Sequence, residues 1–266
     1  MTGLWTAADA PVALRDDAVQ AALCGVLRAW ADDELILGHR HAEWTGFAPD
    51  IESDVALSSI AQEELGHARV LYEQVAAATG ATPDGLAFGR DAPAFGNAVL
   101  VEHPNGDWGF TIVRAWLYDH ADAVRLADLA DAPLGPFAAL ARALQREEKY
   151  HLLFSDAWLV RLARAGDEAT ARLQAALDAI WPDALGLFEE TDDHARLVGD
   201  GLLPAGPVAQ RGRFEAAVRP RLETLGLRPP SVAAATGGRR GHHTAALQAL
   251  LEEMTSVWRT DPTARW

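Results

Sequence analysis

The chain has 266 residues, near the upper size for one hydrophobic core, and 49% of them are apolar. Its 23 basic and 38 acidic residues give a formal charge of −15, which disfavours binding to nucleic acid or to anionic membranes. Cys24 is the only cysteine, and no apolar run approaches the roughly 20 residues that span a bilayer. We therefore expect a cytoplasmic protein without internal disulfides, membrane segments or a nucleic-acid partner.

Apolar residues recur every three or four positions through most of the chain, which is the spacing of amphipathic helices. Proline and glycine separate four long helical segments, predicted at about 12–44, 50–80, 107–132 and 136–165. Residues 81–108 contain too many helix breakers for one helix and predict a long crossover with one short turn of structure. Further helices are predicted at 169–188, 214–227 and 239–258.

No segment shows the two-residue period of a β-strand, so the sequence predicts an all-α fold. We expect a single domain over residues 1–266. It comprises a four-helix core at about 12–165 and a C-terminal helical extension at about 167–266.

Two Glu-x-x-His motifs lie on the second and fourth predicted helices, as Glu64 with His67 and Glu148 with His151. A spacing of three residues places both side chains of a motif on one helix face. The two motifs are 84 residues apart (151 − 67 and 148 − 64), so the second repeats the first one helical hairpin later. This repetition is much more specific than either motif alone.

An acid precedes each motif by nearly the same distance: Glu34 lies 30 residues before Glu64, and Asp119 lies 29 before Glu148. Both acids interrupt apolar helix faces, where an unpaired carboxylate costs several kcal/mol. One acid or Glu-x-x-His motif from each of four helices is the ligand pattern of carboxylate-bridged di-iron and di-manganese bundles. The predicted ligands are therefore Glu34, Glu64, His67, Asp119, Glu148 and His151.

Two further residues share faces with these ligands. Asp122 lies one turn beyond Asp119, and His41 lies two turns beyond Glu34. Each is an alternative ligand or an outer hydrogen-bonding partner of the ligands. Carboxylates and imidazoles without thiolates suit two iron ions, with manganese as the second possibility.

The segment around Arg239 and Arg240 is rich in glycine and carries paired arginines. Such a segment predicts either a flexible basic loop or a site for an anion such as the phosphate of an acyl-CoA substrate.

Several motifs together resemble the C-subunit family of phenylacetyl-CoA epoxidase, over nearly the whole chain. They are Glu-Trp-Thr-Gly-Phe-Ala-Pro at 43–49, Leu-Gly-His-Ala-Arg at 65–69, Val-Glu-His-Pro-Asn-Gly-Asp at 101–107, Tyr-His at 150–151 with Phe-Ser at 154–155, Thr-Gly-Gly-Arg-Arg-Gly-His-His-Thr at 236–244, and Leu-Glu-Glu-Met at 251–254 through to Trp266.

The resemblance implies a ferritin-like fold, pairing with a second ferritin-like subunit, and a complex that includes an iron–sulfur flavoprotein reductase. A homodimer is the alternative pairing. The implied reaction is epoxidation of the ring of phenylacetyl-CoA with dioxygen. In this family the C-type chain is a structural partner that lacks ligands at the positions of Glu34, Glu64, His67 and Glu148. This sequence departs from that pattern by having a ligand-type residue at all four.

Three functions follow as hypotheses. The first is an oxygen-activating di-iron subunit of the epoxidase type. The second is a non-catalytic subunit that pairs with and stabilises a catalytic one. The third is a peroxidase or iron-handling protein of the ferritin or rubrerythrin type, which the ligand set allows and the motifs disfavour.

Overall fold

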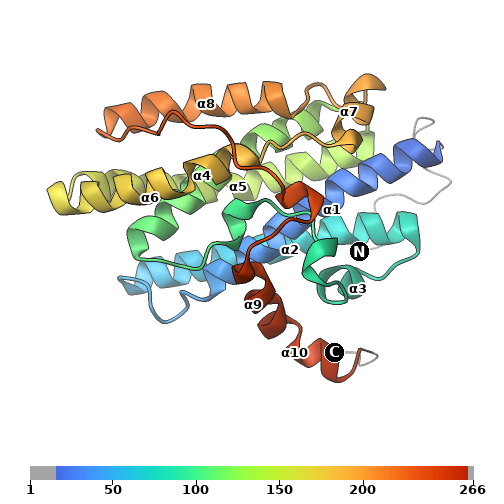
Figure 1. Cartoon of the computed structure of the whole chain (residues 1–266), viewed down its shortest axis with the longest axis horizontal. Coiled ribbons are helices and arrows are strands. Elements are labelled where there is room, and N and C mark those ends of the chain that lie inside the picture. The colour runs from blue at the N-terminus through green and yellow to red at the C-terminus, as the bar shows by residue number, and fades with distance from the viewer. Residues whose placement is uncertain (1–15, 263–266) are drawn as a thin grey trace.

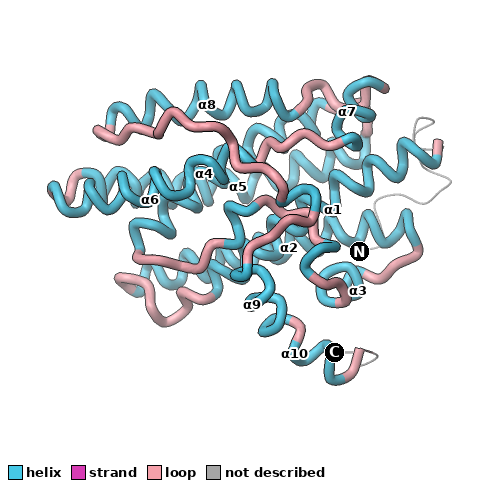
Figure 2. The backbone as a smooth tube through the Cα atoms, viewed as in Figure 1, coloured by secondary structure: helices cyan, strands magenta, loops and turns pink. Residues whose placement is uncertain are grey.

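The computed structural model describes residues 16–262, which contain ten α-helices, three short 3-10 helices and no β-strand. Four long helices form the core of an all-α, ferritin-like bundle (Figures 1 and 2). They are α1 (Asp17–Ala42), α2 (Ile51–Thr79), α4 (Trp108–Asp131) and α5 (Gly135–Ala163). The predicted fold class is confirmed.

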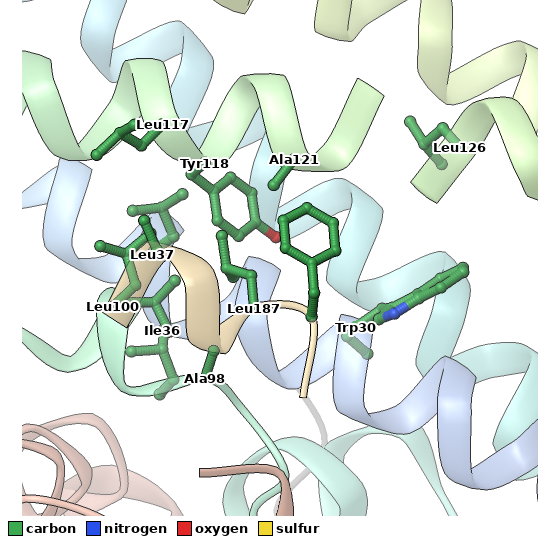
Figure 3. Packing of buried hydrophobic residues seen from close by; sticks show 14 of the residues in the cluster. Trp30, Ile36, Leu37, Ala98, Leu100, Leu117, Tyr118, Ala121, Leu126 and Leu187 are labelled. Carbon is green, nitrogen blue, oxygen red and sulfur yellow. The ribbon is translucent and has the colours of Figure 1, made fainter. Parts of the chain in front are cut away.

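Short connections join the four helices into two hairpins, with α1 packed on α2 and α4 packed on α5. Apolar side chains from both hairpins meet in the interior, as Figure 3 shows for Ile36 and Leu37 of α1 with Tyr118 and Ala121 of α4. Leu187, which follows α6, reaches the same interior. The predicted spacing of apolar residues therefore defines the faces that form the core.

Side-chain caps explain where the long helices begin. Asp50 caps α2 by accepting a hydrogen bond from the Ser53 amide, and Asp107 caps α4 through the Phe110 amide. Asp16 caps α1, so this helix begins at Asp17 and not near residue 12 as predicted. Residues 12–15 lie outside the described part of the chain.

The crossover between the hairpins contains α3 (Pro83–Phe88) and two 3-10 turns, η2 (Ala92–Ala94) and η3 (Val99–Glu102). The sequence predicted only one short turn here. Asp32 of α1 fixes the additional structure, because its carboxylate accepts hydrogen bonds from Arg90 and from the Gly96 amide, the latter at 2.7 Å. A crossover that appears irregular in sequence is thus tied to the core by a buried acid.

The C-terminal part contains α6 (Asp167–Gly186), α7 (Asp192–Gly199) and α8 (Pro207–Thr224). Helix α6 matches the prediction at 169–188. Helix α8 begins seven residues before the predicted 214–227, and α7 was not predicted because eight residues are too few to show a helical period. In the structure α6 and α8 pack on α4, and α7 packs on α1.

The single helix predicted at 239–258 is wrong. This region contains the 3-10 turn η4 (Gly238–Arg240), then α9 (Ala245–Met254) and α10 (Ser256–Thr260). Gly241 has a positive φ of 78°, which ends the turn, and Thr255 separates the last two helices.

One cluster of buried apolar residues includes members from the four-helix core and from the C-terminal helices. The division into a core at about 12–165 and an extension from about 167 within one domain stays a prediction. Among residues 16–262, none of the helices is both long and apolar enough to span a bilayer.

Candidate metal centre

The six predicted ligands come from all four core helices and point into the bundle. Helix α1 provides Glu34, α2 provides Glu64 and His67, α4 provides Asp119, and α5 provides Glu148 and His151. Each residue is only 1–3% exposed. The matched sequence spacings thus bring four acids and two imidazoles into the buried interior.

Five of these residues form two groups with converging donor atoms. Glu34, His67 and Glu148 form one group, and Asp119, Glu148 and His151 form the other. Within each group the donor atoms lie within 4.8 Å of one another. Glu148 belongs to both groups, and its Oε1 lies 3.2 Å from Nδ1 of each histidine. A carboxylate shared by two groups in this way could bridge two cations.

Glu64, the sixth predicted ligand, lies outside both groups. Its Oε2 is 2.9 Å from Nδ1 of His41, which is fully buried. Burial, followed by the charges of Arg114 and His151, holds the pKa of His41 well below its ordinary value, so the ring is neutral. The structure thus places His41 as a hydrogen-bonding partner of Glu64.

Each histidine of the two motifs has a carboxylate partner on the helix that carries the other motif. His67 Nε2 lies 2.8 Å from Glu147 on α5, and His151 Nε2 lies 2.8 Å from Glu63 on α2. In the neutral ring, an N–H at Nε2 that donates to a carboxylate leaves Nδ1 with a lone pair directed at the centre. Neither partner was predicted, although the doubled acid in Glu-Glu-x-x-His signals both of them.

Two hydroxyl groups orient the remaining acids. The Tyr118 hydroxyl donates to Glu34 Oε1 at 2.7 Å, and the Ser155 hydroxyl donates to Asp119 Oδ2 at 2.6 Å. In Figure 3 the ring of Tyr118 lies among core side chains of α1 and α4. Neither residue was predicted. Ser155 lies one turn beyond His151 on α5, a position that could have indicated it.

The structure distinguishes the two aspartates of α4. Asp119 belongs to the second group, whereas Asp122 belongs to neither. Asp122 Oδ1 instead accepts a hydrogen bond from Arg125 Nη2 at 2.8 Å. This geometry favours Asp119 over Asp122 as the ligand contributed by α4.

The clustered charges shift the pKa values of the group. Burial raises the pKa of Glu64 and Asp119 well above the ordinary carboxyl range. Burial lowers the pKa of the histidines, but their carboxylate neighbours outweigh it and raise that of His67 to about 12 and that of His151 to about 10. Burial opposes ionisation of Glu148, yet the two histidine rings, each 3.2 Å from its Oε1, lower its pKa to about 2. Protons therefore balance charges here that divalent cations would otherwise neutralise.

Several atoms at the centre that could bind a metal ion have no hydrogen-bond partner among the described residues. They are Glu34 Oε2, Glu64 Oε1, His67 Nδ1 and Glu148 Oε2. Each unpaired buried polar atom costs about 1–3 kcal/mol. Because the unpaired atoms are carboxylate oxygens and an imidazole nitrogen, without a thiolate, the residues fit two iron or manganese ions.

The two arginines considered for anion binding lie at a different site. Arg239 is buried, and its guanidinium binds the Asp33 carboxylate and the backbone oxygens of Ala29, Gly96 and Leu187. This placement does not favour the predicted role of Arg239 in binding a phosphate. Arg240 is more than half exposed and pairs with Glu189 at 3.1 Å, so its predicted role stays a prediction.

A four-helix bundle with acids and Glu-x-x-His motifs directed inward defines a protein of the ferritin-like class. The chain belongs to the phenylacetic acid catabolic protein family, whose model matches residues 10–266.

Two proteins of Escherichia coli (strain K12) are similar to this chain, and both are components of 1,2-phenylacetyl-CoA epoxidase. The C subunit of that enzyme is 34% identical over 237 residues, which cover 88% of this chain and 95% of that protein. The A subunit is 24% identical over 226 residues, which cover 80% of this chain and 70% of that protein. The chain therefore has relatives among two different subunits of one epoxidase.

Proposed function

We propose that this chain is a di-iron, oxygen-activating subunit of phenylacetate catabolism, which inserts one oxygen atom into an aromatic acyl-CoA. The observation that carries the proposal is the pair of three-residue groups joined by Glu148. Family membership supports the pathway, because both relatives are subunits of 1,2-phenylacetyl-CoA epoxidase.

The ligands would be divided between two cations. Glu34 and His67 would hold one ion, Asp119 and His151 would hold the other, and Glu148 would bridge them. Glu64 would complete the set from the side of His41, to which it is hydrogen-bonded. When bound and reduced, two iron ions supply the electrons and open positions that dioxygen activation requires.

The surrounding residues hold the ligands in a fixed orientation. Glu63 and Glu147 hold the histidine rings with Nδ1 facing the centre, and Tyr118 and Ser155 hold Glu34 and Asp119. The hydrogen bonds from Tyr118 and Ser155 are buried and keep their strength in a low-dielectric interior, whereas the Glu147 and Glu63 side chains are 52% and 41% exposed. Correctly oriented donors reduce the reorganisation that metal binding requires.

We also propose that the chain works with partner subunits. The relatives with 34% and 24% identity are the C and A subunits of one enzyme, so a second ferritin-like chain is the proposed partner. An iron–sulfur flavoprotein reductase is the proposed source of electrons, with manganese as the alternative metal to iron.

The test is oxygen insertion by the iron-loaded chain, with a chemical reductant, isotopically labelled dioxygen and phenylacetyl-CoA. We expect a product that carries one labelled oxygen atom, and its loss in Glu148→Gln. The exposed Glu168→Gln substitution is the control and should keep full activity.

The identity to the C subunit, which is higher than that to the A subunit, favours a second candidate, a non-catalytic subunit that stabilises a catalytic partner. The same assay separates the two candidates when an A-type partner is added. Turnover that needs the partner and is unaffected by Glu148→Gln would support the non-catalytic role and contradict ours.

A further inference from the structure

A cavity of about 200 Å³ lies at one end of the bundle, where α4 begins, α5 ends and α6 begins. Its floor is apolar and consists of Trp108, Leu162, Ala169 and Leu173. For comparison, an apolar cavity of roughly 150 Å³ is large enough to bind benzene. The cavity therefore has the size and chemistry to accept one aromatic ring.

The rim of this cavity is charged. Asp107 and Arg172 both line it, and they form an ion pair at 3.2 Å with side chains that are 42% and 59% exposed. An apolar floor with a polar opening suits a ligand with an aromatic ring at one end and a polar group at the other.

A row of side chains on α5 connects the cavity with the candidate metal centre. His151, Phe154, Trp158 and Leu162 follow one another at spacings of three, four and four residues. These spacings place all four on one face of the helix. At 1.5 Å per residue, the eleven steps along the helix from His151 to Leu162 span roughly 16 Å. The row thus runs from a proposed ligand to the cavity floor.

Trp108 lines the cavity and also contacts this row. Its ring makes edge-on contacts with Phe154 at 6.4 Å, Trp158 at 5.2 Å and Trp44 at 5.0 Å between ring centroids. Trp44 lies in the turn that follows α1, three residues after His41, so this aromatic group joins residues of that turn, of α4 and of α5.

The indole N–H of Trp108 is buried without a hydrogen-bond partner among the described residues. The neighbouring Trp44, in contrast, donates its N–H to the Thr111 hydroxyl at 2.9 Å. A buried N–H without an acceptor is costly. Rotation of the Trp108 ring toward the cavity would let a ligand oxygen accept this hydrogen bond.

We propose that the cavity is an outer binding site for the aromatic ring of an aryl-acyl compound, and that Trp108 closes the route from it to the centre. The N–H of Trp108 donates to the acyl oxygen once the ring of the ligand has entered. The assignment of this ligand class rests on the proposed function, whereas the cavity and the aromatic row are properties of the fold.

The experiment titrates metal-free protein with para-fluorophenylacetate, with fluorine NMR and calorimetry as readouts. We expect saturable binding to the wild-type chain. Leu162→Trp fills the cavity and should abolish binding. Trp108→Phe keeps a ring but removes the N–H, and should weaken binding about threefold to tenfold.

Trp181→Phe is the matched control, because Trp181 is also buried with an unpaired N–H but packs against Phe214. It should bind like the wild type. Absence of saturable binding, or equal losses in Trp108→Phe and Trp181→Phe, would overturn the proposal. Thermal unfolding confirms that each variant is folded.

Iron loading, measured in parallel, separates this proposal from the proposed function. Iron binding without ligand binding overturns the cavity proposal alone. Ligand binding that is sensitive to Leu162→Trp supports the cavity even if the chain binds no iron, an outcome that contradicts the proposed function.

Discussion

Asp33 and Glu34 are neighbours on α1, and both are buried acids. The carboxylate of Asp33 is fully hydrogen-bonded, whereas that of Glu34 is not. Asp33 faces two arginines and a backbone amide. Glu34 faces other acids, a histidine and one tyrosine hydroxyl. The comparison shows which buried charges the fold satisfies by itself.

Both oxygens of Asp33 are paired. Oδ1 accepts from the Ala98 amide at 2.8 Å and from Arg239 at 2.9 Å, and Oδ2 accepts from Arg125 and Arg239 at 2.7 Å each. These bonds join α1, the crossover, α4 and the C-terminal segment. Asp33 therefore has a structural role, and its network leaves no donor site for a ligand.

Glu34 has one partner for two oxygens. Tyr118 donates to Oε1, while Oε2 lies 3.6 Å from His67 Nδ1 without a hydrogen bond. The same deficit recurs at Glu64 and Glu148. Where the fold leaves several buried carboxylate oxygens unpaired at one point, a bound cation is the simplest way to offset the cost of burying their charge.

Replacing Asp33 with asparagine should have the largest effect on stability, and a much larger one than a change at its neighbour Glu34. The change leaves Arg239 buried without a counter-charge and Arg125 with Asp122 as its remaining one, and we expect it to lower the free energy of unfolding by about 3–5 kcal/mol. Urea unfolding measures the loss. The exposed Glu52→Gln is the control and should stay within about 0.5 kcal/mol of the wild type. Equal stabilities would show that the network is not structural.

The second prediction concerns acid sensitivity near the same network. Burial, helped by the charges of Arg239 and Arg125, lowers the pKa of His194 from 6.5 to about 4. The unfolded chain therefore binds the proton more readily, and the associated stability is complete above pH 6.5 and lost as the pH falls through 4. The expected loss is about 3 kcal/mol.

His194→Gln should remove this part of the pH dependence. Urea unfolding at a series of pH values across that window, for both proteins, gives the difference directly. Parallel curves for the wild type and the variant would contradict the predicted role of His194.

A smaller effect is expected at the hydroxyl that holds Glu34. Tyr118→Phe removes the hydrogen bond to Oε1, which should cost about 2 kcal/mol of stability and weaken metal binding, since a hydrogen bond to a charged group contributes about 1.5–3 kcal/mol. Tyr150→Phe is the control, because Tyr150 is exposed. Unchanged metal affinity in Tyr118→Phe would show that the hydroxyl does not position Glu34.

The smallest change in stability is expected for Glu34→Gln in the metal-free protein. Oε2 has no hydrogen bond to lose, and the relief of repulsion between acids offsets the lost attraction to His67, so the free energy of unfolding should change by less than about 1 kcal/mol. Metal content should nevertheless fall. A destabilisation as large as that of Asp33→Asn would place Glu34 in the structural network instead.

The fold and the positions of the six donors could be predicted because both depend on local periodicity. A helix converts a spacing of three residues into a shared face, and two hairpins of similar length bring matching turns together. The doubled acid in each Glu-Glu-x-x-His motif also indicates Glu63 and Glu147 as partners of the histidines, although neither was predicted.

Other features depend on distant parts of the chain. Arg239 lies 206 residues after Asp33, so no local pattern could identify it as a buried ion-pair partner and not an anion site. The orientation of Glu64 toward His41 depends on side-chain packing that helix spacing does not specify. The break in the helix predicted at 239–258 follows from a glycine with positive φ that anchors η4 beside the crossover.

Anomalous X-ray scattering from crystals of the chain, loaded with ferrous iron without oxygen, would show where iron binds. The account predicts two iron peaks, one among Glu34, His67 and Glu148 and the other among Asp119, His151 and Glu148. Iron bound elsewhere, or no iron at these residues while the fold is intact, would contradict it.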